Sequence, residues 1–147
     1  DIADGPSPGE AHLQGLFAFV SGQLDRNRRE EDPMLEAALS RLQETQGALS
    51  LRDLRDELRI TERSFERRFK QYTGMSPKLF ARIAQFQASL QQLRDKQFDK
   101  LSDLAYSNDY ADQSHFIRTF REFAGCSPLK FQEAGPVSHN PNAVLSR

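Results

Sequence analysis

Apolar residues recur along this chain at the spacing of an α-helix, and nowhere do they alternate as in a half-buried β-strand. The first stripe, in residues 10–24, follows an i, i+3, i+4, i+7, i+11 order, and the longest one begins at residue 77. The pattern predicts an all-α fold with helices near residues 10–24, 33–45, 51–58, 62–73, 77–95, 101–105, 113–124 and 128–131.

Cap residues predict where these helices begin and end. A Ser, Thr or Asp precedes six of them, where its side chain accepts a hydrogen bond from the first turn: Asp32, Ser50, Thr61, Ser76, Asp112 and Ser127. Glycines follow three helices, at positions suited to a left-handed stop. Outside the periodic segments we expect a flexible tail at 1–9, a solvated connector at 25–32 and a disordered tail at 135–147.

One segment of the chain occurs twice. Seven positions of residues 64–80 recur in residues 115–131 at a constant offset of 51: Phe65/Phe116, Phe69/Phe120, Tyr72/Phe123, Gly74/Gly125, Ser76/Ser127, Pro77/Pro128 and Phe80/Phe131. Each copy follows a short helix and a tight turn, so the repeat predicts two helix-turn-helix units. About 19 residues of the helix between them span ~28 Å, close to the ~34 Å that separates successive major grooves of duplex DNA.

The distribution of charge favours a nucleic-acid partner, although the net charge of −1 does not. Residues 1–32 carry 3 basic and 7 acidic side chains, whereas residues 50–134 carry 15 basic and 12 acidic ones. Five of the basic residues lie within the twelve positions 59–70, in the first helix-turn-helix unit: Arg59, Arg63, Arg67, Arg68 and Lys70. Local positive charge of this kind binds phosphate, with an affinity that falls steeply with salt.

The outer face of the second helix in each unit carries the candidate DNA-binding side chains. With the aromatic residues turned inward, that face is free to enter a major groove. Arg can bond guanine, Gln adenine and Glu cytosine, and an apolar side chain can contact the thymine methyl group. The candidates are Arg63, Glu66, Arg67 and Lys70 in the first copy, and Gln113, Ser114, His115, Ile117, Arg118 and Arg121 in the second. A solvated polar face is the alternative interpretation.

The second copy resembles the DNA-binding domain of AraC-type transcription activators. The residues that carry the resemblance are Leu104-Ala105, Tyr110, Asp112-Gln113-Ser114, Phe116, Arg118, Phe120-Arg121, Gly125, Ser127-Pro128 and Phe131. The resemblance covers residues 33–134. It implies a seven-helix domain with helix-turn-helix units near 50–73 and 100–124, and a sequence-specific regulator that binds double-stranded DNA. It also implies that Arg63, Glu66, Arg67, Gln113, Ser114, Ile117 and Arg118 lie at recognition positions.

The resemblance further implies partners outside the DNA. Members of the family usually carry a separate domain that senses an effector ligand or dimerises, so the helix at 10–24 is expected to be the end of such a domain or its linker. By itself the apolar stripe of this helix leaves three partners open: this domain, an upstream domain or a second chain. An activator would also contact RNA polymerase. The chain does not begin with Met, and we expect it to be part of a longer protein or a processed form.

Three positions depart from the family pattern. The family often has Gly in the turn of each helix-turn-helix unit, where this chain has Arg59 and Asp109. Arg tolerates a left-handed conformation poorly, so the first turn is expected to differ in shape. Gln85 stands where the family usually has Arg, and this exchange is expected to remove an ion pair between helices.

Other functional classes have little support in the sequence. There is no nucleophile–base pairing, Gly-rich phosphate loop or metal-ligand spacing, so we expect no enzyme, no cofactor and no metal. The single cysteine, Cys126, allows no internal disulfide and fits a reducing cytoplasmic location. No apolar run approaches the ~18 residues of a membrane span. The remaining alternative is a helical protein-interaction module that does not bind DNA.

Overall fold

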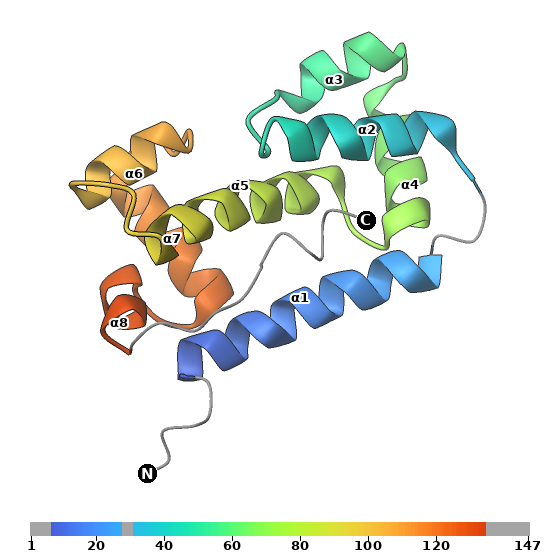
Figure 1. Cartoon of the computed structure of the whole chain (residues 1–147). Coiled ribbons are helices and arrows are strands. Elements are labelled where there is room, and N and C mark those ends of the chain that lie inside the picture. Colours follow the sequence, from blue (N-terminus) through green and yellow to red (C-terminus); the bar gives the residue numbers. More distant parts are fainter. Residues whose placement is uncertain (1–6, 28–30, 135–147) are drawn as a thin grey trace.

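The computed structural model describes residues 7–27 and 31–134, and every regular element within them is an α-helix (Figure 1). The helices are α1 Pro8–Asn27, α2 Pro33–Glu44, α3 Leu51–Leu58, α4 Glu62–Thr73, α5 Pro77–Arg94, α6 Leu101–Ser107, α7 Gln113–Ala124 and α8 Pro128–Glu133. None of the helices in these ranges is long and apolar enough to cross a membrane. The all-α fold expected from the sequence is confirmed.

Local capping sets the ends of most helices, as the sequence predicts. Six helices begin with a side-chain oxygen that accepts a backbone N–H of the first turn, from the predicted residues Asp32, Ser50, Thr61, Ser76, Asp112 and Ser127. Gly74 and Gly125 end α4 and α7 in the left-handed region, at φ +80° and +76°. A residue with a Cβ atom is strained in that region, which explains glycine at both stops.

α1 is longer at both ends than the sequence predicts. The Ser7 hydroxyl accepts the Glu10 N–H at 3.2 Å, and Pro8 occupies the first helical position, where a missing N–H removes no helical bond. A flexible tail through residue 9 is therefore wrong for residues 8 and 9, and a connector from residue 25 is wrong for residues 25–27. The expected tail at 135–147 lies outside the described residues.

The sequence repeat is also a repeat in space. In the first copy the ring centroids of Phe65, Phe69 and Phe80 are spaced by 5.5 and 5.6 Å, with interplanar angles of 62° and 72°. The three equivalent rings of the second copy are spaced by 5.8 and 5.5 Å, with angles of 69° and 71°. These are edge-to-face contacts, which aromatic pairs prefer to a face-to-face stack. Each helix-turn-helix unit is thus built on the same three-ring stack.

The two turns are alike in conformation and differ in length. Arg59 and Asp109 both adopt the left-handed conformation, at φ 55° and 65°, and both turns begin with the same pair of backbone hydrogen bonds. Arg59 is therefore strained but does not change the handedness of its turn. Two residues separate Arg59 from α4, whereas three separate Asp109 from α7. Arg59 thus adopts the conformation that Gly would favour, and the difference in shape expected from it is not found in the backbone conformation. Separately, the two turns differ in length by one residue.

Gln85 cannot form the ion pair expected of an Arg at its position, and it forms a hydrogen bond between helices instead. Its Nε2 donates to the main-chain oxygen of Asn108 at 2.8 Å, at the end of α6. A neutral side chain thus links the central helix to the second unit, because the turn offers a carbonyl oxygen as acceptor.

α1 lies across both helix-turn-helix units and contacts α4 and α7 (Figure 1). Its apolar stripe is buried: Leu13, Phe17, Val20 and Leu24 are at most 9% exposed. Full burial of such a side chain contributes about 1.5–3 kcal/mol, so α1 is held firmly. Of the three partners that the sequence leaves open for this stripe, the structure places this domain against it.

Candidate nucleic-acid interface

The outer face of α4 is exposed and positively charged. Phe65 and Phe69 point into the core and are fully buried, which turns the opposite face of the helix outward. That face carries Arg63, Glu66, Arg67 and Lys70, all exposed. Within residues 7–27 and 31–134 none of its three cations forms an ion pair. Their charges remain available to a phosphate group or a base edge.

Arg68 belongs to the scaffold and not to this face. Its guanidinium donates to both carboxylate oxygens of Asp32, at 3.1 and 2.9 Å, and approaches the sulfur of Met34. Asp32 also caps α2, so the pair holds α4 against α2. The sequence count of local positive charge includes Arg68, because nothing in the sequence connects it to a carboxylate 36 positions away. The free positive charge of α4 is therefore smaller than the sequence suggests.

The outer face of α7 occupies the same place in the repeat and has different chemistry. Gln113, Ser114, Arg118 and Arg121 are exposed, and Ile117 is half-buried. The two arginines have no ion-pair partner within the described part of the chain. At the offset of 51 they match Arg67 and Lys70 of α4. The remaining positions differ, since Ser114 and Ile117 match a cation and an anion of α4.

His115 has a structural role in the turn before α7. Its Nδ1 accepts the Ala111 N–H at 3.3 Å, and its ring meets the Tyr110 ring edge-on at 5.2 Å between centroids. Because Nδ1 acts as an acceptor, the neutral ring carries its proton on Nε2. The side chain is half-buried and shapes the start of the helix, so any contact with DNA would use Nε2.

α4 and α7 both end against α1, the first at Gly74 and the second at Gly125 (Figure 1). A Cβ atom on Gly74 would lie 2.7 Å from the side chain of Asn27, and one on Gly125 would lie 2.9 Å from the ring of His12. The N-terminal ends of both helices consequently point away from α1. A helix N-terminus carries partial positive charge, which favours a nearby phosphate.

An ion pair joins α7 to α5, the central helix. The Arg82 guanidinium lies 2.6 Å from a carboxylate oxygen of Glu122, and its central carbon lies 5.2 Å from the centre of the Phe123 ring. The hydrogen bond from Arg82 lowers the pKa of the Glu122 carboxyl below its ordinary value. Arg82 is therefore engaged within the domain, whereas Arg118 and Arg121 on the same helix as Glu122 are not.

Comparisons with known proteins agree with this architecture. The family described as "Helix-turn-helix domain" matches residues 54–134. A curated relative, the "HTH-type transcriptional activator RhaS" of Escherichia fergusonii, is 28% identical over 127 residues, which are 86% of this chain and 45% of that protein. The chain thus spans less than half the length of this relative.

A solved structure has the same fold. It is the C-terminal domain of AraT, a response regulator from Geobacillus stearothermophilus, with a TM-score of 0.65 and 20% sequence identity. The likeness covers 74% of this chain and 90% of that domain.

Proposed function

Because the chain belongs to the AraC-type helix-turn-helix family and is the DNA-binding domain of a transcription regulator, we propose that it reads one asymmetric site on double-stranded DNA. In this proposal α4 and α7 enter successive major grooves. The supporting observation is that two units with equivalent ring stacks and the same glycine C-caps display different outer faces. Two helices with different outer faces bind different half-sites, because each base pair offers its own donors and acceptors in the major groove.

The proposal divides the outer faces into two roles. The free cations Lys70 and Arg121 lie in the last turns of their helices and contact phosphates, which sets register and contributes affinity without sequence information. The residues nearer the N-terminal ends contact base edges. These are Arg63, Glu66 and Arg67 on α4, and Gln113, Ser114, Ile117 and Arg118 on α7. His115 contributes through its Nε2 atom.

Paired arginine variants test the site. We expect Arg67→Ala and Arg118→Ala each to weaken binding to a selected duplex by about 1–3 kcal/mol if the side chain reads a base. The matched controls are Arg68→Ala and Arg82→Ala, which remove the same charge from arginines that are paired inside the domain. Fluorescence anisotropy on the selected duplex and on random duplex measures the difference. Unchanged binding of both Arg67→Ala and Arg118→Ala would reject the site assignment.

Salt dependence separates the two roles. Five free cations lie on the two faces: Arg63, Arg67, Lys70, Arg118 and Arg121. If all five contacted phosphates, log K would fall against log salt with a slope near −4.5. A variant that loses a phosphate contact makes this slope shallower by about 1, and a variant that loses a base contact changes specificity instead. Absence of binding to any duplex at low salt would favour a protein-interaction module.

We also propose two partners beyond the DNA. The relative from Escherichia fergusonii is named a transcriptional activator, and the matched region is 45% of its length. On this analogy RNA polymerase contacts the bound protein, and an effector ligand binds a further domain. Recruitment of purified RNA polymerase to a promoter duplex that carries the selected site, with and without the protein, tests the first partner. Equal recruitment in both cases would contradict it.

A further inference from the structure

The first residues of α1 are anchored to the second helix-turn-helix unit. Gly9 lies so close to α8 that a Cβ atom there would be 2.8 Å from the ring of Phe131. The next residue, Glu10, accepts a hydrogen bond from the Arg94 guanidinium at 2.6 Å, at the end of α5. In this ion pair the Glu10 side chain is buried, at 2% exposure, and the Arg94 side chain is largely covered, at 11%. The start of α1 thus meets the end of the central helix and the helix that follows α7.

The last residues of α1 are anchored to the first unit. The side chains of Gln23 and Asn27 lie against Gly74, the stop of α4. Asn27 Nδ2 donates to the Gln23 main-chain oxygen at 2.8 Å and to the Gln23 side-chain oxygen Oε1 at 3.3 Å, and these bonds order the two side chains at this contact. The same helix therefore reaches the C-terminal ends of both α4 and α7, since His12 lies against Gly125 near its start.

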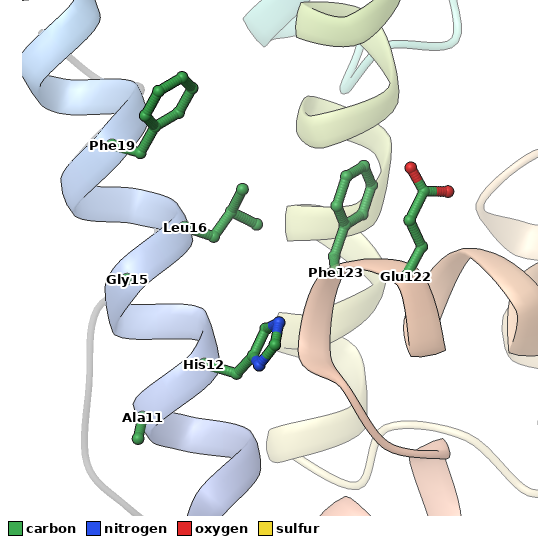
Figure 2. Close-up of a pocket in the computed structure, with 7 residues that line it drawn as sticks. All are labelled: Ala11, His12, Gly15, Leu16, Phe19, Glu122 and Phe123. Atoms are coloured by element: carbon green, nitrogen blue, oxygen red, sulfur yellow. The ribbon is translucent and has the colours of Figure 1, made fainter.

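Between these anchors, the side of α1 that faces α7 is incompletely filled. An open pocket of about 460 Å³ lies there, lined by residues of α1 and α7. Figure 2 shows His12 and Leu16 of α1 pointing toward Phe123 of α7 at this pocket. Phe19, also at the pocket, is 51% exposed. The attachment of α1 consequently depends on its buried stripe and on the contacts near its two ends.

α1 gives the two units a second mechanical connection. α5 joins them along the chain, running from the first unit to the second, and a single helix permits each unit to pivot about its end. α1 runs back from the second unit to the first and is buried against the core common to both. Its contacts at His12 and Gln23 are separated by 11 positions, or roughly 17 Å of helix. Two helices of opposite direction, attached at both units, make a closed frame.

We propose that α1 is a brace that fixes the separation and orientation of α4 and α7, and so sets the half-site spacing that the domain accepts. Gly9, Glu10, His12 and Gln23 are then positioning residues, which act on the DNA site without contact with DNA. The consequence for DNA rests on the function proposed above, whereas the mechanical part does not. A prearranged pair of binding elements gains affinity through effective concentration, and that gain is lost when the geometry loosens.

Distance measurements test the brace in the absence of DNA. Nitroxide labels are placed on the exposed positions of α3 and α6 through Arg52→Cys and Asp103→Cys, in a Cys126→Ser background. Gly9→Ala forces the start of α1 away from Phe131, whereas Gly15→Ala places the same methyl group in open space on the same helix. We expect the inter-label distance distribution from pulsed electron resonance to broaden in Gly9→Ala and to match the parent in Gly15→Ala.

A second, less disruptive variant keeps the test valid if Gly9→Ala fails to fold. The double variant His12→Ala/Gln23→Ala removes one side-chain contact at Gly125, the end of α7, and one at Gly74, the end of α4. It does so without forcing atoms together. We expect a smaller broadening in the same direction, with the helical circular dichroism signal retained. If neither this variant nor a folded Gly9→Ala widens the distribution, α1 does not brace the two units and the proposal is overturned.

Binding to spacer variants tests the consequence for DNA. The probes are a duplex selected by the parent protein, the same duplex with one base pair inserted between its halves, and duplexes with one half scrambled. We expect Gly9→Ala to bind the selected duplex about tenfold more weakly, to discriminate less against the insertion, and to bind single halves as the parent does. Equal discrimination in Gly9→Ala and Gly15→Ala would overturn the spacing role. If the parent protein binds equally well after either half of the duplex is scrambled, the proposed function is rejected. The distances between the labels would still show whether α1 braces the two units.

Discussion

The two helix-turn-helix units have the same interior and different exteriors. Phe65, Phe69 and Phe80 form an edge-to-face stack that the second unit reproduces ring by ring, within a few tenths of an ångström and about ten degrees. The outer face of α4 has three free cations around Glu66, whereas that of α7 has two, with Ser114 and Ile117 at the differing positions. The repeated aromatic and glycine residues therefore build the scaffold, whereas the exposed positions that differ between the copies give the outer faces of α4 and α7 their different chemistry.

The units also differ in what supports them. In the first, the hydroxyl of Tyr72 donates to Glu36 and ties α4 to α2. In the second, Phe123 stands at the matching position, has no hydroxyl, and lies under the guanidinium of Arg82. The same position in the repeat therefore uses a hydrogen bond in one copy and a cation–π contact in the other. Equivalent scaffolds do not require equivalent neighbours.

The largest expected effect comes from removing the central ring of each stack. Phe69→Ala and Phe120→Ala each delete a fully buried ring that contacts the other two rings of its own stack, and Phe120 also contacts Phe86 of α5. We expect each to lower the free energy of unfolding by about 3–5 kcal/mol, because the transfer energy of the ring is lost and a cavity remains. Urea denaturation measures both. Two losses that differ by more than about 2 kcal/mol would contradict the equivalence of the two interiors.

A smaller effect separates the two turns. Arg59→Gly is expected to raise the free energy of unfolding by about 1 kcal/mol, because glycine adopts the left-handed conformation without strain. Asp109→Gly should gain less, because Asp tolerates this conformation better than Arg. Thermal unfolding of the two variants, each compared with the parent, shows which substitution stabilises the protein more. A gain for Asp109→Gly that equals or exceeds that for Arg59→Gly would show that strain does not distinguish the turns.

The smallest effect is a shift in two titrations, one in each unit. A hydrogen bond from Arg41 lowers the pKa of Glu57 below its ordinary 4.5, and one from Arg82 does the same for Glu122. Since the folded pKa values lie below the unfolded ones, the stability that these pairs contribute is present above pH 4.5 and is lost as pH falls through the folded values.

Carboxyl-carbon NMR titration measures these two pKa values directly. We expect Arg82→Leu to return Glu122 to its ordinary pKa and to leave Glu57 unchanged, while Arg41→Leu does the reverse. A parent protein in which either carboxyl titrates at 4.5 or above would contradict the ion pair in that unit.

Much of the fold follows from short-range signals in the sequence. Thr61 and Asp112 begin their helices, and Gly74 and Gly125 end them, because capping depends on residues three or four positions away. The sequence predicts too late a start for α1, because Pro and Gly usually interrupt helices. Proline is tolerated in the first turn, and Gly9 is required by a ring of α8 distant in the sequence.

The sequence predicts which side chains of α4 and α7 are exposed, but it does not predict which charges are paired within the domain. Helical periodicity places the outer faces of α4 and α7 on the surface, since the opposite residues are aromatic and buried. Periodicity does not show which charges are already paired. Arg68 is neutralised by Asp32, and His115 serves the turn before α7, through contacts that only the folded chain brings together or orients. The position of α1 across both units likewise depends on tertiary contacts.

Selection of bound duplexes from random DNA by the parent protein tests the central claim most directly. If two like scaffolds present unlike faces to successive grooves, the selected sequences will contain two different motifs in fixed order, with centres about one helical turn, ~10 base pairs, apart. A single motif, or two copies of one motif in either orientation, would contradict the claim that the differences between α4 and α7 specify an asymmetric site.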